Sequence, residues 1–167
     1  DQQQAAIGKL LSKASIDWDN YGNPVGIEFS HTCTDQDLEN LGLLNTVRAV
    51  RLAYCFQISD RAIERLVELP HLQILDLYRN NPIEHNNFTN GYDLTTQPVI
   101  TDKSLESIAK IESLKELYLW DNQFSEEGIR QLRSLPNLKI LGFRSRLVSQ
   151  AAVGELKRVF PNTEIQN

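Results

Sequence analysis

A histidine and a cysteine lie two residues apart, at His31 and Cys33. A Cys–His pair can form an activated nucleophile when the imidazole deprotonates the thiol and a third group orients the imidazole. The neighbouring sequence supplies no such group, and the chain contains no C-x-x-C, H-E-x-x-H or G-x-S-x-G motif and no glycine-rich phosphate loop. We therefore expect a protein that is not an enzyme and that has no catalytic residues.

An acidic segment near the N-terminus partly fits a calcium-binding loop. Asp17, Asp19 and Glu28 take positions 1, 3 and 12 of such a loop, and Gly22 takes position 6. Tyr21 stands at position 5, where an oxygen ligand is needed, and the following segment alternates like a strand instead of forming the required helix. This pattern favours a polar hairpin turn. We expect no bound metal and no cofactor.

Composition limits the possible partners. The chain has 167 residues, 41% of them hydrophobic and 23% charged, with a net charge of −5. This is typical of one soluble domain, and an acidic balance argues against nucleic acid as a partner because phosphates would be repelled. No apolar run reaches the roughly 18 residues of a membrane span. The two cysteines are too few for a disulfide framework, and we expect both thiols to be free.

Five segments share one helical pattern. Each begins with a Ser or Thr, the residue type that caps a helix, and aliphatic residues follow at offsets of 4, 7 and 10, which lie on one helical face. The five capping positions are Thr34, Ser59, Thr101, Ser125 and Ser149. The spacing predicts five amphipathic helices.

A short strand pattern follows each helical pattern. Aliphatic residues stand at an offset of 16 from each cap: Val50, Leu75, Leu117, Leu141 and Ile165. An earlier strand contains Ile27 and Phe29, and successive strands are 23, 25, 42 and 24 residues apart. Residues 1–14 predict a further helix, residues 15–19 and 25–30 a hairpin, and residues 163–166 a last strand. Strand, turn and helix therefore repeat along the chain.

Residues 72–80 and 114–122 both match L-x-x-L-x-L-x-x-N, and Cys55 takes the position of Asn80 in its own repeat. The chain thus resembles the leucine-rich-repeat family, in its ribonuclease-inhibitor-like or cysteine-containing subtype, and residues 160–165 resemble the closing segment of short bacterial members. The resemblance implies an α/β fold: a right-handed solenoid with a short parallel sheet on the concave face and helices on the convex face. It also implies export, or tethering by a segment upstream of Asp1.

We expect a single domain over residues 1–167. Residues 1–23 would form an N-terminal helix-hairpin cap, residues 24–160 the repeats, and residues 161–167 a C-terminal cap strand. Residues 81–99 would be an insertion at the rim, because one repeat is longer than the others. Asn90-Gly91 within it is a hairpin signal.

In such a sheet, outward-facing positions of successive strands align into columns. One column would hold Glu28, Arg51, Asp76, Tyr118 and Gly142, and the next would hold Ser30, Ala53, Tyr78, Trp120 and Arg144. Tyr, Trp and Arg gather in the middle strands, which is typical of an interface centre. The expected partner-binding residues are Arg51, Tyr54, Asp76, Tyr78, Arg79, Tyr118, Trp120, Asp121 and Arg144, with Phe88 and Tyr92 of the insertion.

We therefore expect a non-catalytic module that recognises a protein through the concave sheet face and the rim insertion. Aromatic rings also stack on sugars, so a carbohydrate- or cell-wall-binding module is the alternative. The sequence does not identify the protein or glycan.

Overall fold

The computed structural model describes residues 2–78, 80 and 100–167. Within these residues the protein is α/β, with a seven-stranded sheet whose order follows the sequence from β1 to β7. Only β1 and β2 pair antiparallel, and every later neighbour is parallel. The strands are β1 (Ala14–Trp18), β2 (Pro24–Phe29), β3 (Ala49–Arg51), β4 (Ile74–Asp76), β5 (Glu116–Trp120), β6 (Ile140–Arg144) and β7 (Glu164–Gln166).

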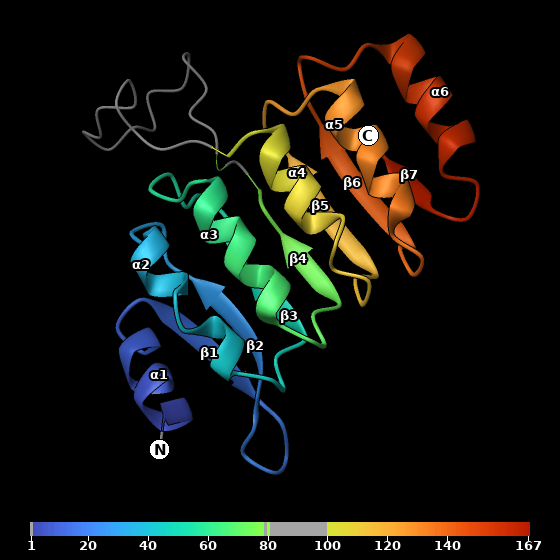
Figure 1. Ribbon diagram of the computed structural model, residues 1–167. Coiled ribbons are helices and arrows are strands. Elements are labelled where there is room, and N and C mark those ends of the chain that lie inside the picture. Colours follow the sequence, from blue (N-terminus) through green and yellow to red (C-terminus); the bar gives the residue numbers. More distant parts are fainter. Residues whose placement is uncertain (1, 79, 81–99) are drawn as a thin grey trace.

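The helices lie along one side of the sheet (Figure 1). They are α1 (Gln2–Leu10), α2 (Asp35–Leu38), α3 (Asp60–Arg65), α4 (Asp102–Ile108), α5 (Glu126–Gln131) and α6 (Gln150–Val159). Three short 3₁₀ segments follow α2, α3 and α5: η1 (Leu41–Leu43), η2 (Leu66–Glu68) and η3 (Leu132–Ser134). The α/β class and the strand positions predicted from the sequence are confirmed.

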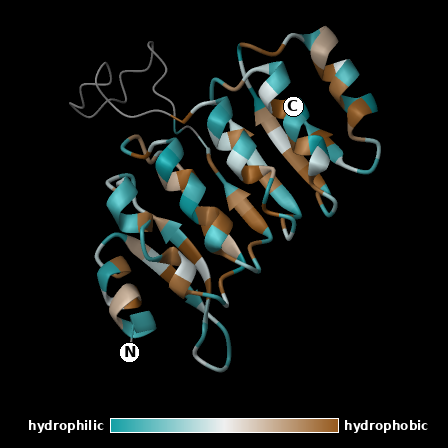
Figure 2. Cartoon of the chain, in the orientation of Figure 1, coloured by the Kyte–Doolittle hydropathy of each residue, from teal (hydrophilic) through white to brown (hydrophobic). Residues whose placement is uncertain are grey.

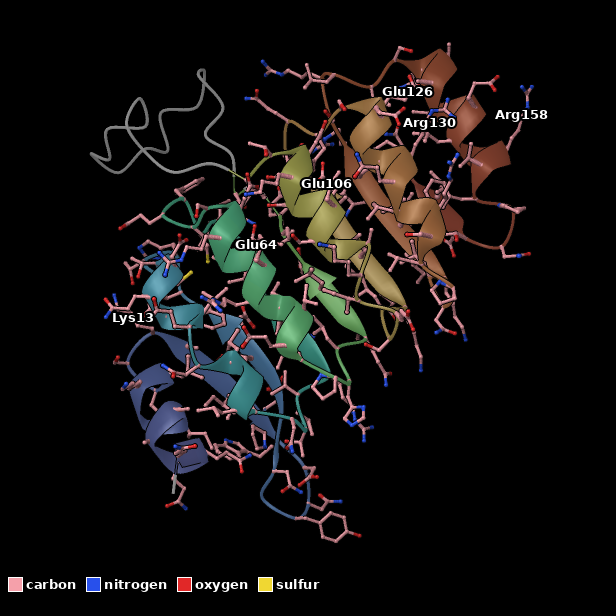
Figure 3. The ribbon with its side chains drawn as sticks, in the orientation of Figure 1. Lys13, Glu64, Glu106, Glu126, Arg130 and Arg158 are labelled. Atoms are coloured by element: carbon pink, nitrogen blue, oxygen red, sulfur yellow. The ribbon has the colours of Figure 1, made fainter. Side chains whose placement is uncertain are left out.

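The hydrophobic core lies between the sheet and the helices. Val50, Leu75, Leu117 and Leu141 lie in register in four neighbouring strands and are completely buried. Figure 2 shows hydrophobic residues along the strands and hydrophilic as well as hydrophobic residues along the helices. The outer side of the helical layer is charged, with Glu64, Glu106 and Arg130 projecting from α3, α4 and α5 (Figure 3). The other side of the sheet, called the open face below, has no helix over it within the described residues.

The predicted capping residues begin the helices as expected. Ser59 and Thr101 each accept a hydrogen bond from the backbone N–H two residues later, and Ser125 and Ser149 accept one from three residues later. The helices are shorter than predicted, because the apolar residues at offset 7 in three units, Leu41, Leu66 and Leu132, open 3₁₀ turns. Apolar offsets that advance by three residues match the three residues per turn of a 3₁₀ helix.

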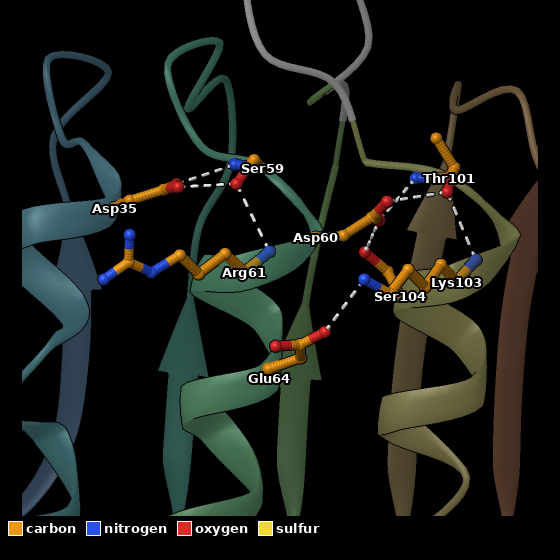
Figure 4. Close-up of polar contacts among 8 residues, drawn as sticks. All are labelled: Asp35, Ser59, Asp60, Arg61, Glu64, Thr101, Lys103 and Ser104. Atoms are coloured by element: carbon orange, nitrogen blue, oxygen red, sulfur yellow. Dashed lines mark hydrogen bonds and ion pairs between the residues drawn. The ribbon is translucent and has the colours of Figure 1, made fainter.

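A row of carboxylates, separate from the capping hydroxyls, joins the starts of neighbouring helices (Figure 4). The N–H and hydroxyl of Ser59 donate to Asp35 at 2.7 and 2.5 Å. Thr101 donates to Asp60 in the same way at 2.8 and 2.7 Å, and the Ser104 hydroxyl donates to it as well. Ser125 repeats the arrangement with Asp102. Each carboxylate therefore joins the start of its own helix to the cap of the next.

The carboxylates fit only because the facing helix position is small. Gly128 faces Asp102, and a Cβ at Gly128 would overlap the carboxylate of Asp102. Ser104 takes the equivalent position opposite Asp60, where its hydroxyl becomes a donor instead of an obstacle. The sequence pattern of caps did not reveal this row, since the acid bonds to the following unit and not to its own helix.

A row of buried amides holds the turns that follow the strands. The Asn80 side-chain oxygen accepts from the Cys55 N–H at 2.8 Å, and the Asn122 side-chain oxygen accepts from the Asn80 N–H at 2.9 Å. Asn122 also donates to the Leu77 carbonyl at 2.5 Å. Both amides are buried. Because Asn80 follows β4 and Asn122 follows β5, this row joins the turns that follow β3, β4 and β5.

The N-terminal helix is shorter than the predicted span of residues 1–14. It ends at Leu10, and Ala14 already belongs to β1, because the backbone of Lys13 accepts a hydrogen bond from the Ser30 N–H at 2.7 Å. The predicted hairpin is present as β1 and β2. At its turn Asp19 accepts hydrogen bonds from the backbones of Tyr21 and Asn23, so this acid shapes the turn.

Asp60→Asn tests the row of carboxylates. Burial alone would raise the pKa of Asp60, but the hydrogen bonds from Ser104 and Thr101 outweigh it and hold that pKa below 3.8. The charged form is thus favoured in the folded state, so its contribution is full well above pH 3.8 and is lost as the pH falls below that value. We expect Asp60→Asn to lower the free energy of unfolding at neutral pH by about 1–3 kcal/mol.

Urea unfolding at several pH values measures this effect. The difference between wild type and Asp60→Asn should shrink as the pH falls below about 4, and it should vanish once the pH is below the lowered pKa of Asp60, where both chains carry an uncharged side chain. Glu64→Gln is the matched control, because Glu64 lies in an exposed ion pair with Lys103 at 3.3 Å and such pairs contribute little. Equal unfolding of all three proteins at neutral pH would contradict the role assigned to Asp60.

Candidate functional site

The open face is built from aligned strand positions. Glu28, Arg51, Asp76, Tyr118 and Gly142 lie in register across β2 to β6, as the sequence predicted. Trp120 and Arg144 lie in register one row further along. Side chains of a strand alternate between the two faces, and Leu77 and Leu119 are buried. Tyr78 and Trp120, one position beyond these leucines, therefore share the open face with Asp76 and Tyr118.

Arg51 and Asp76 place opposite charges side by side. The Arg51 Nη1 lies 3.7 Å from the Asp17 Oδ2 of β1. Asp76, the register partner of Arg51, accepts a hydrogen bond from the Tyr78 N–H at 3.0 Å. Burial raises the pKa of Asp76, and the Tyr78 N–H and Arg51 only partly offset this. The carboxylate is therefore less solvated than an ordinary surface acid, and a donor from a partner would meet less competing water there.

Two tyrosines form one aromatic contact over β3 and β4. The ring centroids of Tyr54 and Tyr78 are 5.2 Å apart with the planes at 88°, an edge-to-face arrangement. Tyr54 also contacts Phe56 in this way at 6.4 Å. The Tyr54 backbone has a φ of 61°, in the left-handed region that non-glycine residues adopt at some energetic cost. Its side chain is 41% exposed, so the fold holds this ring outward in a fixed position.

Trp120 lies across the neighbouring strand. A Cβ at Gly142 would come within 3.0 Å of three atoms of the indole ring, so only glycine leaves room for the ring in this place. One side of the indole is thereby packed against the backbone of β6. The sequence placed Gly142 in the first column and gave it no function. In the structure Gly142 positions Trp120, the largest side chain of the second column.

Asp121 and Arg144 form a two-pronged ion pair beside Trp120. The Arg144 Nε and Nη2 donate to the two carboxylate oxygens of Asp121 at 2.6 and 2.9 Å. The Asp121 side chain is 8% exposed and that of Arg144 is 64% exposed. Asp121 also has a φ of 58°. It stands three residues after Tyr118, just as Tyr54 stands three residues after Arg51 of the same row. The pair therefore presents mainly the guanidinium to solvent, held rigidly by a shielded acid.

One row of the open face was missed by the sequence analysis. This row stands one position before the buried row that contains Val50, Leu75, Leu117 and Leu141. Its members, in register, are Gly26, Ala49, Ile74, Glu116, Ile140 and Glu164. Ile74 and Ile140 are partly exposed there, and Glu116 accepts a hydrogen bond from the Tyr118 hydroxyl at 3.0 Å. The signal was present, because Glu116 stands two residues before Tyr118 in the same strand and must face the same side.

Three of the expected partner-binding residues, Arg79, Phe88 and Tyr92, lie outside the described residues, as does the whole insertion 81–99. The other eight are described. They fall into four neighbouring groups: Arg51 with Asp76, Tyr54 with Tyr78, Tyr118 with Glu116, and Trp120 with Asp121 and Arg144.

The candidate catalytic pair does not form a reactive site. His31 is exposed, whereas Cys33 is completely buried. Cys55 is completely buried as well, and both thiols are free. Among the described residues no group of three or more His, Cys, Asp or Glu side chains could hold a metal ion.

Gly142→Ala tests the position of Trp120. The added methyl group would force the indole away from β6, so its ring should become more accessible to water. In a Trp18→Phe background, which leaves Trp120 as the single tryptophan, we expect a red-shifted emission and stronger quenching by acrylamide. Gly154→Ala is the control, because a Cβ at Gly154 meets nothing within 4 Å. Unchanged emission in Gly142→Ala would contradict this packing.

In comparisons with known proteins, no family model and no curated protein matches the chain. Within the described residues, none of the helices has the length and apolar character needed to cross a bilayer.

Proposed function

We propose that the chain is a right-handed leucine-rich-repeat solenoid with the open face on its concave side. The regular strand steps, the sequential strand order and the buried Asn80 and Asn122 at equivalent turns support this reading. Each strand-turn-helix unit would then be one coil. In such an architecture the inner sheet is the surface that several coils build together.

We further propose that this face recognises a protein partner and that the module is not an enzyme. The observation that carries the proposal is the gathering of Tyr54, Tyr78, Tyr118 and Trp120 on one face of three adjacent strands, β3, β4 and β5. Aromatic side chains supply a large apolar contact area with few rotatable bonds, so ordering them on binding has a small entropic cost.

The aromatic side chains are already ordered before a partner arrives. Tyr54 and Tyr78 support each other edge to face, and Trp120 is packed against Gly142. A surface fixed in this way loses little freedom on association, which favours affinity. Partly exposed Ile74 and Ile140 extend the apolar area beside these rings.

The charged groups around the aromatic side chains would determine orientation. Arg144 is held by Asp121, and Arg51 lies between Glu28 and Asp76 in the same row. Alternating signs across neighbouring strands reject a partner that docks in a shifted register, because like charges would then meet. The charges thus supply specificity, while the rings supply most of the contact area.

Affinity capture with matched variants tests the proposal. Tyr78→Ala with Trp120→Ala removes two rings from the open face, and we expect at least a tenfold loss of affinity for the partner. Glu106→Ala with Lys110→Ala alters two exposed residues of the helical side and should bind as wild type does. A partner retained equally by both double variants, with circular dichroism unchanged, would contradict recognition through the open face.

A second candidate rests on the Trp120 ring, which packs next to Gly142 and could serve as a stacking platform. Such a platform suits the apolar face of a sugar ring, so a carbohydrate- or cell-wall-binding module is the alternative. A glycan array with wild type and Trp120→Ala separates the two functions. Loss of glycan signals in Trp120→Ala, with no protein captured by wild type, would favour the carbohydrate module.

A further inference from the structure

Two buried thiols lie in neighbouring turns and have no part in the proposed function. Cys33 follows β2 and Cys55 follows β3, and neither side chain is accessible to solvent. The parallel register of Glu28 with Arg51 continues through both turns, because Thr34 forms a parallel bridge with Gln57. Thr32 therefore stands opposite Cys55, and Cys33 is the next residue along the chain.

This register places the two cysteines within reach of a disulfide bond. Neighbouring strands are about 4.8 Å apart and one residue advances about 3.3 Å, which gives a Cα separation of roughly 6 Å. Disulfide-bonded cysteines have Cα atoms about 4.4–6.8 Å apart. Both side chains also point into the core, so they approach each other from the same side of their turns.

One backbone carbonyl connects both residues. The Ser30 carbonyl accepts a hydrogen bond from the Cys33 N–H at 3.0 Å and from the Cys55 thiol at 3.4 Å. The sulfur of Cys55 is therefore held next to the backbone of Cys33. The neighbouring Cys33 thiol, together with burial, raises the pKa of Cys55 above its ordinary value, as expected where the two sulfurs are close and dry.

We propose that Cys33 and Cys55 form an intramolecular disulfide bond when the protein folds in the presence of a small-molecule disulfide. One cysteine thiolate attacks the oxidant, which forms a mixed disulfide and releases one thiolate. The second cysteine then attacks the protein sulfur of the mixed disulfide, forms the Cys33–Cys55 bond and releases the second thiolate. The two cysteines are oxidised, each losing its proton to solvent, and the oxidant is reduced to two thiols.

The bond would restrict the unfolded chain more than the folded one. It closes the loop between residues 33 and 55, which contains α2, η1 and β3. A crosslink between groups already in contact needs little rearrangement of the folded state, whereas it removes conformations from the unfolded state. The oxidised protein should therefore resist urea better than the reduced protein.

Oxidised glutathione is the probe. Reduced protein is unfolded in urea, refolded in a glutathione redox buffer and then treated with an alkylating agent in urea, which exposes any thiol that is still free. We expect a product that carries no alkyl group and no glutathione, has lost two hydrogen atoms in mass, and yields a linked peptide containing Cys33 and Cys55. Its urea midpoint should rise, and reduction should return it to the starting value.

Cys33→Ala and Cys55→Ala are the controls. Each keeps one thiol, so each should end alkylated or as a glutathione adduct, with a urea midpoint that does not respond to an internal bond. Two alkylated thiols, or two glutathione adducts, in refolded wild type with native circular dichroism would overturn the proposal. An internal bond that lowers the urea midpoint would overturn it too, because the folded turns would then not accommodate the link.

Discussion

The structure depends on hydrogen bonds that run sideways, from each strand-turn-helix unit to the next. Parallel backbone pairing joins the strands, the Asn80 and Asn122 amides join the turns, and the Asp35, Asp60 and Asp102 carboxylates join the helix starts. The strand pairing continues from β1 to β7, the amide row joins the turns after β3, β4 and β5, and the carboxylate row joins the starts of α2 to α5. They fix the register, and the register determines which side chains stand beside each other on the open face. The candidate site is therefore a product of lateral order.

Much of this order could be predicted, because it follows from spacing. The alternation of buried leucines identified the strands, and equal offsets from one strand to the next gave the row from Glu28 to Tyr118. Capping hydroxyls identified where helices begin. Local patterns of this kind work because one residue type satisfies one local requirement, such as an apolar face or an unpaired backbone N–H.

Other features depend on two distant residues at once and were missed for that reason. The hydrogen bond between Asp60 and Thr101 spans 41 positions, and the residues next to either partner carry no pattern that predicts it. The same holds for Trp120 over Gly142, where the role of a glycine is visible only once the indole is in place. The approach of the Cys55 thiol to the Ser30 carbonyl, beside Cys33, was not predicted either, because the direction of a side chain in a turn cannot be read from the number of residues between two strands.

The row of carboxylates ends at the last helix. Glu126 occupies the position of Asp102 one unit later, and its longer side chain turns back to Arg130 at 2.5 Å. Among the described residues no carboxylate reaches Ser149, whose hydroxyl serves only its own helix. In a linear array each unit is stabilised by its interfaces with the neighbouring units. Because α6 lacks the carboxylate link that joins α4 to its neighbours, α6 should unfold locally before α4 does. The backbone amides of α6 should therefore exchange with solvent sooner than those of α4.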